Sequence, residues 1–309
     1  MRYLFIINPI AGNGKGLTYI DKIQDYFKDK SEEFKIELTE YKNHAEEIAR
    51  EYSCRNDYHI FAVGGDGTIN EVLNGLIGTN SILSIIPCGT GNDFVKTLYQ
   101  DFDIENYISK LVEGCSTYID LAKVNNRYYL NISSVGFDAE VAYNVTKFKH
   151  IKFLPGSISY LLSVLYTAFK FRALDLEIHL DSKVINQKTF LLASSNGKCY
   201  GGGFFITPEA SIFDGKLDIC NIKEVSLFKL LTSIGKALKG DIKHIKEVSY
   251  SKCEKVIISS SNEFTLNVDG ELLRTNHADF KIIPKGIKVM LPSDATVPIQ
   301  AQIQESVNF

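Results

Sequence analysis

Three glycine-rich segments, each following an apolar run, constrain this 309-residue chain more than any other feature of its sequence. Glycine at a strand-to-helix turn lets backbone N–H groups converge on a phosphate, and the helix that follows adds its positive N-terminal end. One such turn is weak evidence because any tight turn favours glycine. Three turns at the carboxyl ends of successive strands would line one crevice. Together they predict a nucleotide-phosphate site at Asn8–Gly16, Gly64–Thr68 and Gly89–Asp93.

The sequence around these segments predicts strands that alternate with helices. Continuous apolar runs are typical of parallel strands buried on both faces, and apolar residues recur at helical spacing between them. We therefore predict a three-layer α/β domain over residues 1–127. Its strands are expected at Tyr3–Asn8, Phe34–Leu38, His59–Val63 and Ile82–Ile86.

The pattern changes near Tyr128, after which runs of alternating apolar and polar residues follow one another. Such alternation predicts half-buried strands, so residues 128–288 are expected to form a β-sandwich domain. We predict two helices within it, at Ser157–Phe171 and Ser226–Gly240. The last segment, 289–309, is expected to be a tail that returns to the first domain.

Composition excludes several classes of protein. The chain has 34 Lys and Arg against 37 Asp and Glu, and 45% of its residues are hydrophobic, which excludes disordered, collagen-like and multi-span membrane proteins. Its formal charge of −3 disfavours nucleic acid as a partner. The six cysteines are widely spaced and include no C-x-x-C pair, so we expect reduced thiols and a cytoplasmic protein.

Some acidic residues in turns suggest metal or acid–base chemistry, and each also has a purely structural interpretation. Asp66, held between glycines, can hold a Mg²⁺ that bridges phosphates, or it can cap the next helix. Asp269-Gly270-Glu271 and the Asp-Gly pair at Asp214 are strong turn signals by themselves. The standard P-loop and dinucleotide templates are not met.

Five motifs follow one another along the chain: Asn-Pro-x-Ala-Gly-x-Gly-Lys (8–15), Gly-Gly-Asp-Gly-Thr (64–68), Gly-Thr-Gly-Asn-Asp-Phe (89–94), Gly-Phe-Asp-Ala-Glu-Val (136–141), and Gly-Gly-Gly (201–203) with Asp-Gly-Lys-Leu-Asp (214–218). Together they resemble the diacylglycerol kinase catalytic family, in particular its soluble bacterial lipid kinases, which are distantly similar to NAD kinases. The resemblance covers essentially the whole chain and implies a two-domain kinase that binds ATP between the α/β domain and the β-sandwich, which would complete the active site.

The resemblance also implies roles for individual residues. Asp66 and Asp93 would lie near the phosphates and their Mg²⁺. Glu271 would accept the proton of the lipid hydroxyl with Asp269 beside it, although two neighbouring carboxylates leave open which one is the base. A structural Mg²⁺ would be held by the backbone of Ser211 and Lys216 and the carboxylate of Asp214. ATP would contact Asn8, Pro9, Ile10, Ala11, Gly12, Thr39, Gly65, Asp66, Gly67, Thr68, Ile69, Asn70, Glu71 and Thr90.

The expected activity is transfer of the γ-phosphoryl group of ATP to a lipid hydroxyl, with diacylglycerol as the leading acceptor and phosphatidic acid as the product. An NAD kinase-like phosphotransferase and a non-catalytic nucleotide- or lipid-binding module are the alternatives. We expect peripheral contact with the inner face of the membrane, and a homodimer. The uncharged stretch Phe153–Phe169 could lie at a bilayer surface or pack on the sandwich as a buried helix.

Overall fold

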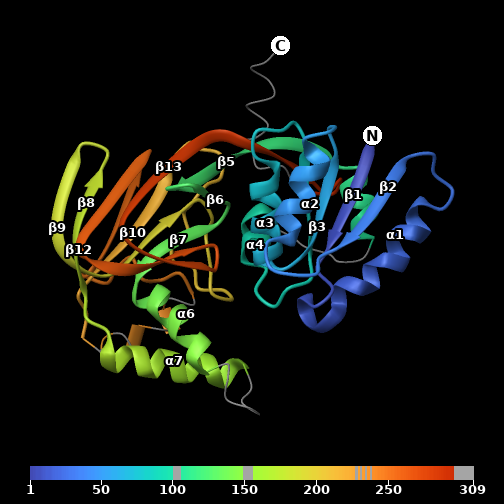
Figure 1. Cartoon of the computed structure of the whole chain (residues 1–309). Coiled ribbons are helices and arrows are strands. Elements are labelled where there is room, and N and C mark those ends of the chain that lie inside the picture. Colours follow the sequence, from blue (N-terminus) through green and yellow to red (C-terminus); the bar gives the residue numbers. More distant parts are fainter. Residues whose placement is uncertain are drawn as a thin grey trace. The chain divides into compact units, whose positions relative to one another are not determined.

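The computed structural model describes residues 1–99, 106–148, 156–226, 229, 232–233, 235–236 and 239–295, without the side chains of 146–148 and 156–161. The chain forms two compact units, whose elements are labelled in Figure 1. Strands β5 (Cys115–Val124) and β13 (Glu271–Leu291) each have residues in both units. The first unit comprises Met1–Leu121, Ile212–Gly215 and Ile283–Phe309, and the second comprises Ala122–Ser211 and Lys216–Ile282.

The first unit is built on a parallel sheet with the strand order β2-β1-β3-β4. The end of β13 continues this sheet through the pairing of Val289 with Leu83. Every residue of β3 and β4 is buried, which confirms the prediction of strands covered on both faces. The strands are β1 (Arg2–Ile7), β2 (Glu33–Leu38), β3 (His59–Gly64) and β4 (Ile82–Pro87).

Helices cover both faces of this sheet. The ring of Phe27 contacts Tyr3 and Phe5 on one face, while Leu4 and Ile6 are fully buried on the other. Helices α2 and α3 pack together closely, and a Cβ added at Gly75 would lie 2.5 Å from the carbonyl oxygen of Glu46. The helical segments are η1 (Ala11–Thr18), α1 (Tyr19–Phe27), α2 (His44–Ser53), α3 (Asp66–Leu76), α4 (Asp93–Leu98) and α5 (Tyr107–Val112).

The second unit is mainly antiparallel sheet, as predicted, with the order β11-β10-β9-β7-β12-β13. Strand β8 pairs with the first half of β9 and the first half of β12. Strand β7 pairs with the second half of each of these two strands. The register of β12 shifts between Ser259 and Phe264 as it passes from β8 to β7. Besides its parts of β5 and β13, the second unit contains the strands β6 (Arg127–Tyr129), β7 (Ile132–Gly136), β8 (Leu174–Leu180), β9 (Lys183–Ser195), β10 (Leu217–Lys223), β11 (Val248–Cys253) and β12 (Lys255–Val268).

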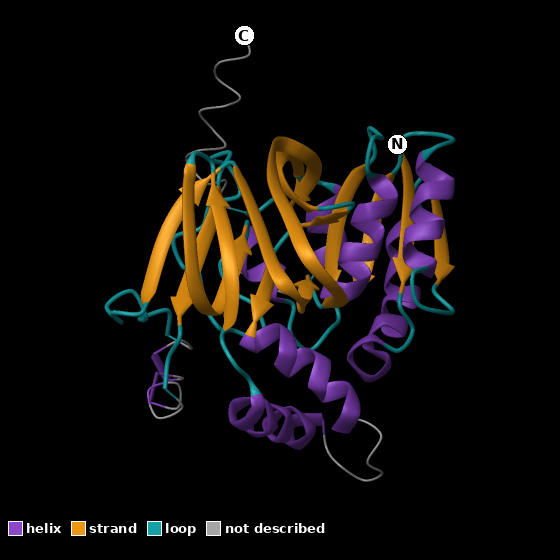
Figure 2. Cartoon of the chain, turned by 60° about the vertical axis from the view of Figure 1, so that its left-hand side comes forward, coloured by secondary structure: helices purple, strands orange, loops and turns teal. Residues whose placement is uncertain are grey.

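Two apolar clusters hold the second unit together. One lies among the strands and includes Tyr129, Phe264 and Phe280. The other lies between the sheet and the helices α6 (Phe137–Phe148) and α7 (Gly156–Lys170), which pack together at one end of the strands (Figure 2). Helix α7 confirms the helix predicted at Ser157–Phe171 to within one residue. The apolar positions of the other predicted helix, Ser226–Gly240, lie outside the described residues.

Candidate functional site

The first glycine loop folds back tightly at the carboxyl end of β1. Gly12 and Gly14 adopt positive φ angles of 57° and 90° within η1. A Cβ at Gly12 would lie 1.9 Å from the carbonyl oxygen of Cys88, which follows β4. Only glycine fits here, because a side chain would meet both an unfavourable φ and a backbone atom. This close approach places the first loop against Cys88, which directly precedes the third glycine loop.

The second and third loops also touch through their glycines. A Cβ at Gly89 would lie 2.5 Å from the Cα atom of Gly65. Asn8, in the first loop, donates from Nδ2 to Oγ1 of Thr68 at 3.1 Å and accepts the backbone N–H of Ile10 at Oδ1. The three loops predicted to converge therefore do meet at one edge of the parallel sheet.

The carboxylate of Asp66 links the second loop to the third. It accepts backbone N–H groups from Asp93 at 3.2 Å and from Phe94 at 3.4 Å, at the start of α4. Burial raises the pKa of Asp66, the amide of Asp93 opposes the rise, and the carboxylate charge of Asp93 adds to it. Asp93 itself is buried and pairs with Nζ of Lys96 at 2.7 Å. Two carboxylates thus share one small, partly buried region.

The carboxylates of Asp66 and Asp93 both lie close to Gly91. A Cβ placed on Gly91 would lie 3.1 Å from Oδ2 of Asp66 and 3.5 Å from Oδ2 of Asp93. Hard oxygen ligands of this kind fit Mg²⁺, which usually takes one or two protein carboxylates and completes its shell with water and substrate phosphates. Within the described residues, no group of three or more His, Cys, Asp or Glu side chains is placed to hold a metal ion.

The other residues expected around ATP differ in what surrounds them. Thr39 follows β2, and its N–H donates to the carbonyl of Ile7, so it lies at the same sheet edge as the loops. Thr90 is exposed in the third loop. Ile69 is buried in α3, and the carboxylate of Glu71 accepts the N–H of Ala45 at the start of α2. These last two residues therefore have packing and capping contacts of their own.

In the second unit, the Asp269-Gly270-Glu271 turn separates its two carboxylates. Asp269 has a φ of 45°, and its carboxylate accepts three backbone N–H groups, from Leu130 at 2.9 Å, Asn131 at 3.3 Å and Ile132 at 2.9 Å. Glu271 instead pairs with the guanidinium of Arg127 at 2.9 Å, and both side chains are about three-quarters buried. The two carboxylates therefore have different kinds of partner, since backbone N–H groups hold Asp269 and a guanidinium holds Glu271.

The residues expected around a structural metal are distributed over both units. Asp214 belongs to the first unit, whereas Ser211 and Lys216 belong to the second, in which Nζ of Lys216 pairs with Glu254. Near Asp214 lies Asp120, which accepts the N–H of Gly215 at 2.6 Å and that of Lys285 at 2.9 Å. Burial raises the pKa of Asp120, and the charge of Asp214 contributes to the rise.

Sequence reasoning missed two residues near these positions, Arg127 and Asp120. Asp120 had a detectable signal, because it is a charged residue inside the otherwise apolar run Ile119–Ala122. Arg127 had none, because nothing in a single sequence connects it with Glu271, which lies more than a hundred positions along the chain.

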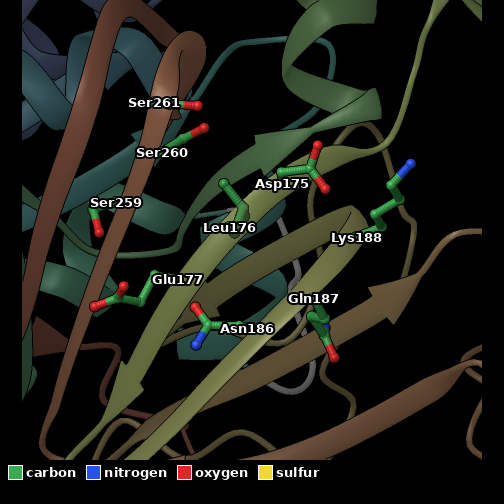
Figure 3. Close-up of a pocket in the computed structure, with 9 residues that line it drawn as sticks. All are labelled: Asp175, Leu176, Glu177, Asn186, Gln187, Lys188, Ser259, Ser260 and Ser261. Carbon is green, nitrogen blue, oxygen red and sulfur yellow. The ribbon is translucent and has the colours of Figure 1, made fainter.

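A groove of about 590 Å³ lies away from all of these residues, on β8, β9 and β12 (Figure 3). Its lining is formed by Asp175–Glu177, Asn186–Lys188 and Ser259–Ser261, which are almost all polar. None of the catalytic, ATP-binding or metal-binding residues predicted from the sequence lines this groove. A polar lining of this kind does not suit an acyl chain, which needs predominantly apolar walls.

Comparisons with known proteins agree with the motifs. Residues 2–124 match the family described as the diacylglycerol kinase catalytic domain, and residues 131–291 match the YegS C-terminal NAD kinase β-sandwich-like domain. A diacylglycerol kinase of Bacillus subtilis (strain 168) is 28% identical over 296 residues, which cover 95% of this chain and 97% of the relative. A diacylglycerol kinase of Staphylococcus haemolyticus (strain JCSC1435) is 32% identical over 251 residues, covering 80% and 75%.

The fold also matches a solved structure. The crystal structure of a diacylglycerol kinase from Bacillus anthracis aligns with a TM-score of 0.71 over 96% of this chain and 98% of that one, at 23% identity. At this level of identity the likeness concerns the fold. It confirms the expected architecture of an α/β unit and a β-sandwich unit.

Proposed function

This chain belongs to the diacylglycerol kinase catalytic family, a family of lipid kinases, and we propose that it transfers the γ-phosphoryl group of ATP to the hydroxyl of diacylglycerol to give phosphatidic acid. The observation that carries the proposal is the convergence of three glycine loops around Asp66. Such loops suit a triphosphate because phosphoryl transfer depends mainly on positioning and on neutralising charge.

The donor half of the reaction is assigned to the first unit. Backbone N–H groups of the loops would hold the phosphates, and the packed glycines fix those groups before ATP arrives, so little reorganisation is needed. Asp66 and Asp93 would hold Mg²⁺, which neutralises phosphate charge when it is bound. The two amides that Asp66 accepts keep its carboxylate oriented for this task.

The acceptor half is assigned to Glu271, not to Asp269. A carboxylate that accepts three backbone N–H groups is committed to holding its turn, and this describes Asp269. Glu271 is held by the side chain of Arg127, a partner that it can exchange for the acceptor hydroxyl. We therefore propose that Glu271 takes the proton from the lipid hydroxyl as the oxygen attacks the γ-phosphorus, so that no phospho-enzyme forms.

The acceptor lies in a membrane, so we also propose that the enzyme works as a peripheral protein at the inner face of the bilayer. The described part of the chain contains no helix long and apolar enough to cross a membrane. A homodimer remains a prediction, as does a structural Mg²⁺ near Asp214.

Thin-layer separation of labelled products tests the activity and the acceptor together. The purified protein is incubated with ATP labelled at the γ-phosphate, Mg²⁺ and a total lipid extract, with NAD in a parallel reaction. We expect one labelled lipid that migrates with phosphatidic acid. Labelled NADP without any labelled lipid would favour the NAD kinase-like alternative, and binding of ATP without any labelled product would favour a non-catalytic module.

A further inference from the structure

Over its described side chains, Leu162–Lys170, helix α7 buries two small polar residues and exposes three large apolar ones. Ser163 and Thr167 are fully or almost fully buried, whereas Phe169 is 71% exposed, Leu165 41% and Leu162 36%. The buried hydroxyls have partners: Ser163 donates to the carbonyl of Val141 at 2.6 Å, and Thr167 accepts from Nδ2 of Asn144 at 3.0 Å. The helix therefore packs on its own unit through small polar side chains together with Val164 and Ala168, and it exposes large apolar side chains on its outer face.

An ordinary surface helix of this protein shows the opposite arrangement. In α1, Ile23 and Phe27 are buried while Asp21 and Asp25 are exposed, as expected when water covers the outer face. The three exposed residues of α7 are spaced three and four positions apart, so they form one continuous stripe along the helix. A stripe of large apolar side chains costs free energy in water unless something apolar covers it.

The charges around this stripe favour an anionic covering surface. The helix Gly156–Lys170 contains no Asp or Glu. The exposed cations Lys170 and Arg172 lie at and just beyond its C-terminal end. Lys170 extends over the ring of Tyr166, with Nζ 4.6 Å from the ring centroid and 3.0 Å from the hydroxyl. Cations beside an apolar helix face are typical of segments that lie in the headgroup region of anionic bilayers.

We propose that the stripe of Leu162, Leu165 and Phe169, with Lys170 and Arg172 at its end, is the surface by which this enzyme docks on an anionic membrane. The inference rests on the proposed function, because that function requires the protein to reach a lipid acceptor in a bilayer. The stripe inserts among the acyl chains while the two cations contact lipid phosphates. Helix α7 thus lies on the membrane and does not cross it.

Sedimentation with lipid vesicles tests the proposal. The full chain and the double variant Leu165→Gln/Phe169→Gln are mixed with vesicles of phosphatidylcholine, with or without phosphatidylglycerol, and the bound fraction is measured. Burying even one such side chain improves partitioning about tenfold, so the variant should bind at least about tenfold more weakly. Val184→Gln is the matched control, because Val184 is an exposed apolar residue (53%) on β9 of the same unit. It should bind like the wild type.

Charge variants provide a second test that does not alter the apolar stripe. Lys170→Gln and Arg172→Gln should each lower binding to phosphatidylglycerol vesicles about fivefold, and the loss should shrink at high salt. Lys183→Gln, at an exposed lysine on β9, is the control. The proposal would be overturned if the stripe variant bound vesicles as well as the wild type does. It would also be overturned if wild-type binding did not depend on the phosphatidylglycerol content. A stripe variant that changes from dimer to monomer with unchanged vesicle binding would assign the face to a second copy instead.

A separate measurement distinguishes failure of this inference from failure of the proposed function. The wild type is assayed on a short-chain diacylglycerol that dissolves without forming a bilayer, and on vesicle-borne diacylglycerol. The ratio of the vesicle rate to the short-chain rate should fall in the stripe variant by the same factor as its vesicle binding. An unchanged ratio contradicts the docking surface, whereas a wild type inactive on both lipids contradicts the kinase activity.

Discussion

The glycine loops of the first unit and the acidic turn of the second are built in different ways. The loops are held by close backbone contacts, such as Gly65 against Gly89, and their proposed function depends on main-chain N–H groups. The turn depends on side chains, because Asp269 fixes the backbone and Arg127 holds Glu271. A site made of backbone N–H groups can be recognised in the sequence by its glycines. A site made of side chains depends on partner residues that no local motif shows. The following predictions test this contrast.

The largest expected loss of activity follows substitution of Asp66. Asp66→Asn removes the charge that would hold Mg²⁺ and leaves the size of the side chain unchanged. We expect the rate of lipid phosphorylation to fall about a thousandfold, as when a preorganised charge-stabilising group is lost. The exposed Asp25 of α1 provides the control, and Asp25→Asn should stay within about twofold. A rate for Asp66→Asn within a few-fold of the wild type would contradict the donor-site assignment.

Glu271 and Asp269 should respond to substitution in opposite ways. Glu271→Gln removes the proposed base, so kcat should fall about 10²- to 10⁴-fold with little change in the free energy of unfolding. Asp269→Asn sets an amide against backbone N–H donors, so it should cost about 1–3 kcal/mol of stability. Denaturant unfolding and steady-state kinetics on both variants check this. A stable Asp269→Asn variant that has lost all turnover would reverse the two roles.

Arg127 should affect turnover less than Glu271 does, because it acts through that residue. Arg127→Met removes the ion pair and lets the carboxylate move, and displacements of this kind lower rates about ten- to a hundredfold. We expect kcat to fall while the KM for ATP stays constant, and Arg127→Lys to restore part of the rate. A change in the KM for ATP alone would show that Arg127 serves the nucleotide instead.

The glycines of the loops should differ from one another according to the space around them. Gly12→Ala meets both a positive φ and the carbonyl of Cys88, so it should destabilise the protein by at least about 2 kcal/mol. Gly67→Ala meets no atom within 4 Å at the start of α3, and should stabilise by about 0.5–1 kcal/mol through helix propensity. Thermal unfolding distinguishes the two, and equal melting temperatures would contradict tight packing of the first loop.

The smallest effect on activity is expected at His59, which lies at the end of β3 away from the glycine loop. Burial lowers the pKa of His59 from 6.5 to about 3. In the unfolded chain His59 therefore takes up a proton near pH 6.5, whereas in the folded chain it stays neutral until about pH 3. The free energy of unfolding falls as the pH falls from about 6.5 towards 3. His59→Gln should remove this contribution, roughly 1.4 kcal/mol per pH unit in that window. An unchanged pH dependence of unfolding would show that His59 is not buried.

Much of the fold could be predicted because its signals are local. Buried parallel strands appear as continuous apolar runs, so Ile82–Ile86 was correctly assigned to a strand. The positive φ angles of Gly12, Asn13 and Gly14 delay the start of α1 until Tyr19, which apolar periodicity does not show. The helix at α7 was predicted, but the sequence left open whether its apolar residues are exposed or buried, since periodicity alone does not show which face meets the sheet.

The site could be predicted only where it is made of backbone. Convergence of the loops follows from the rule that parallel strands end at one edge of a sheet, and contacts such as Asn8 to Thr68 agree with it. The proposed division of roles between Asp269 and Glu271 could not be predicted. It depends on Leu130–Ile132 and Arg127, which only the folded strands bring to the turn.

Amide hydrogen exchange with and without ATP and Mg²⁺ tests most directly whether the three loops hold a triphosphate together. We predict slower exchange at Ala11–Lys15, Gly65–Thr68 and Thr90–Asp93 over one range of ATP concentration, and none of this slowing with adenosine. Slowing in only one loop, or equal slowing by adenosine, would contradict the account.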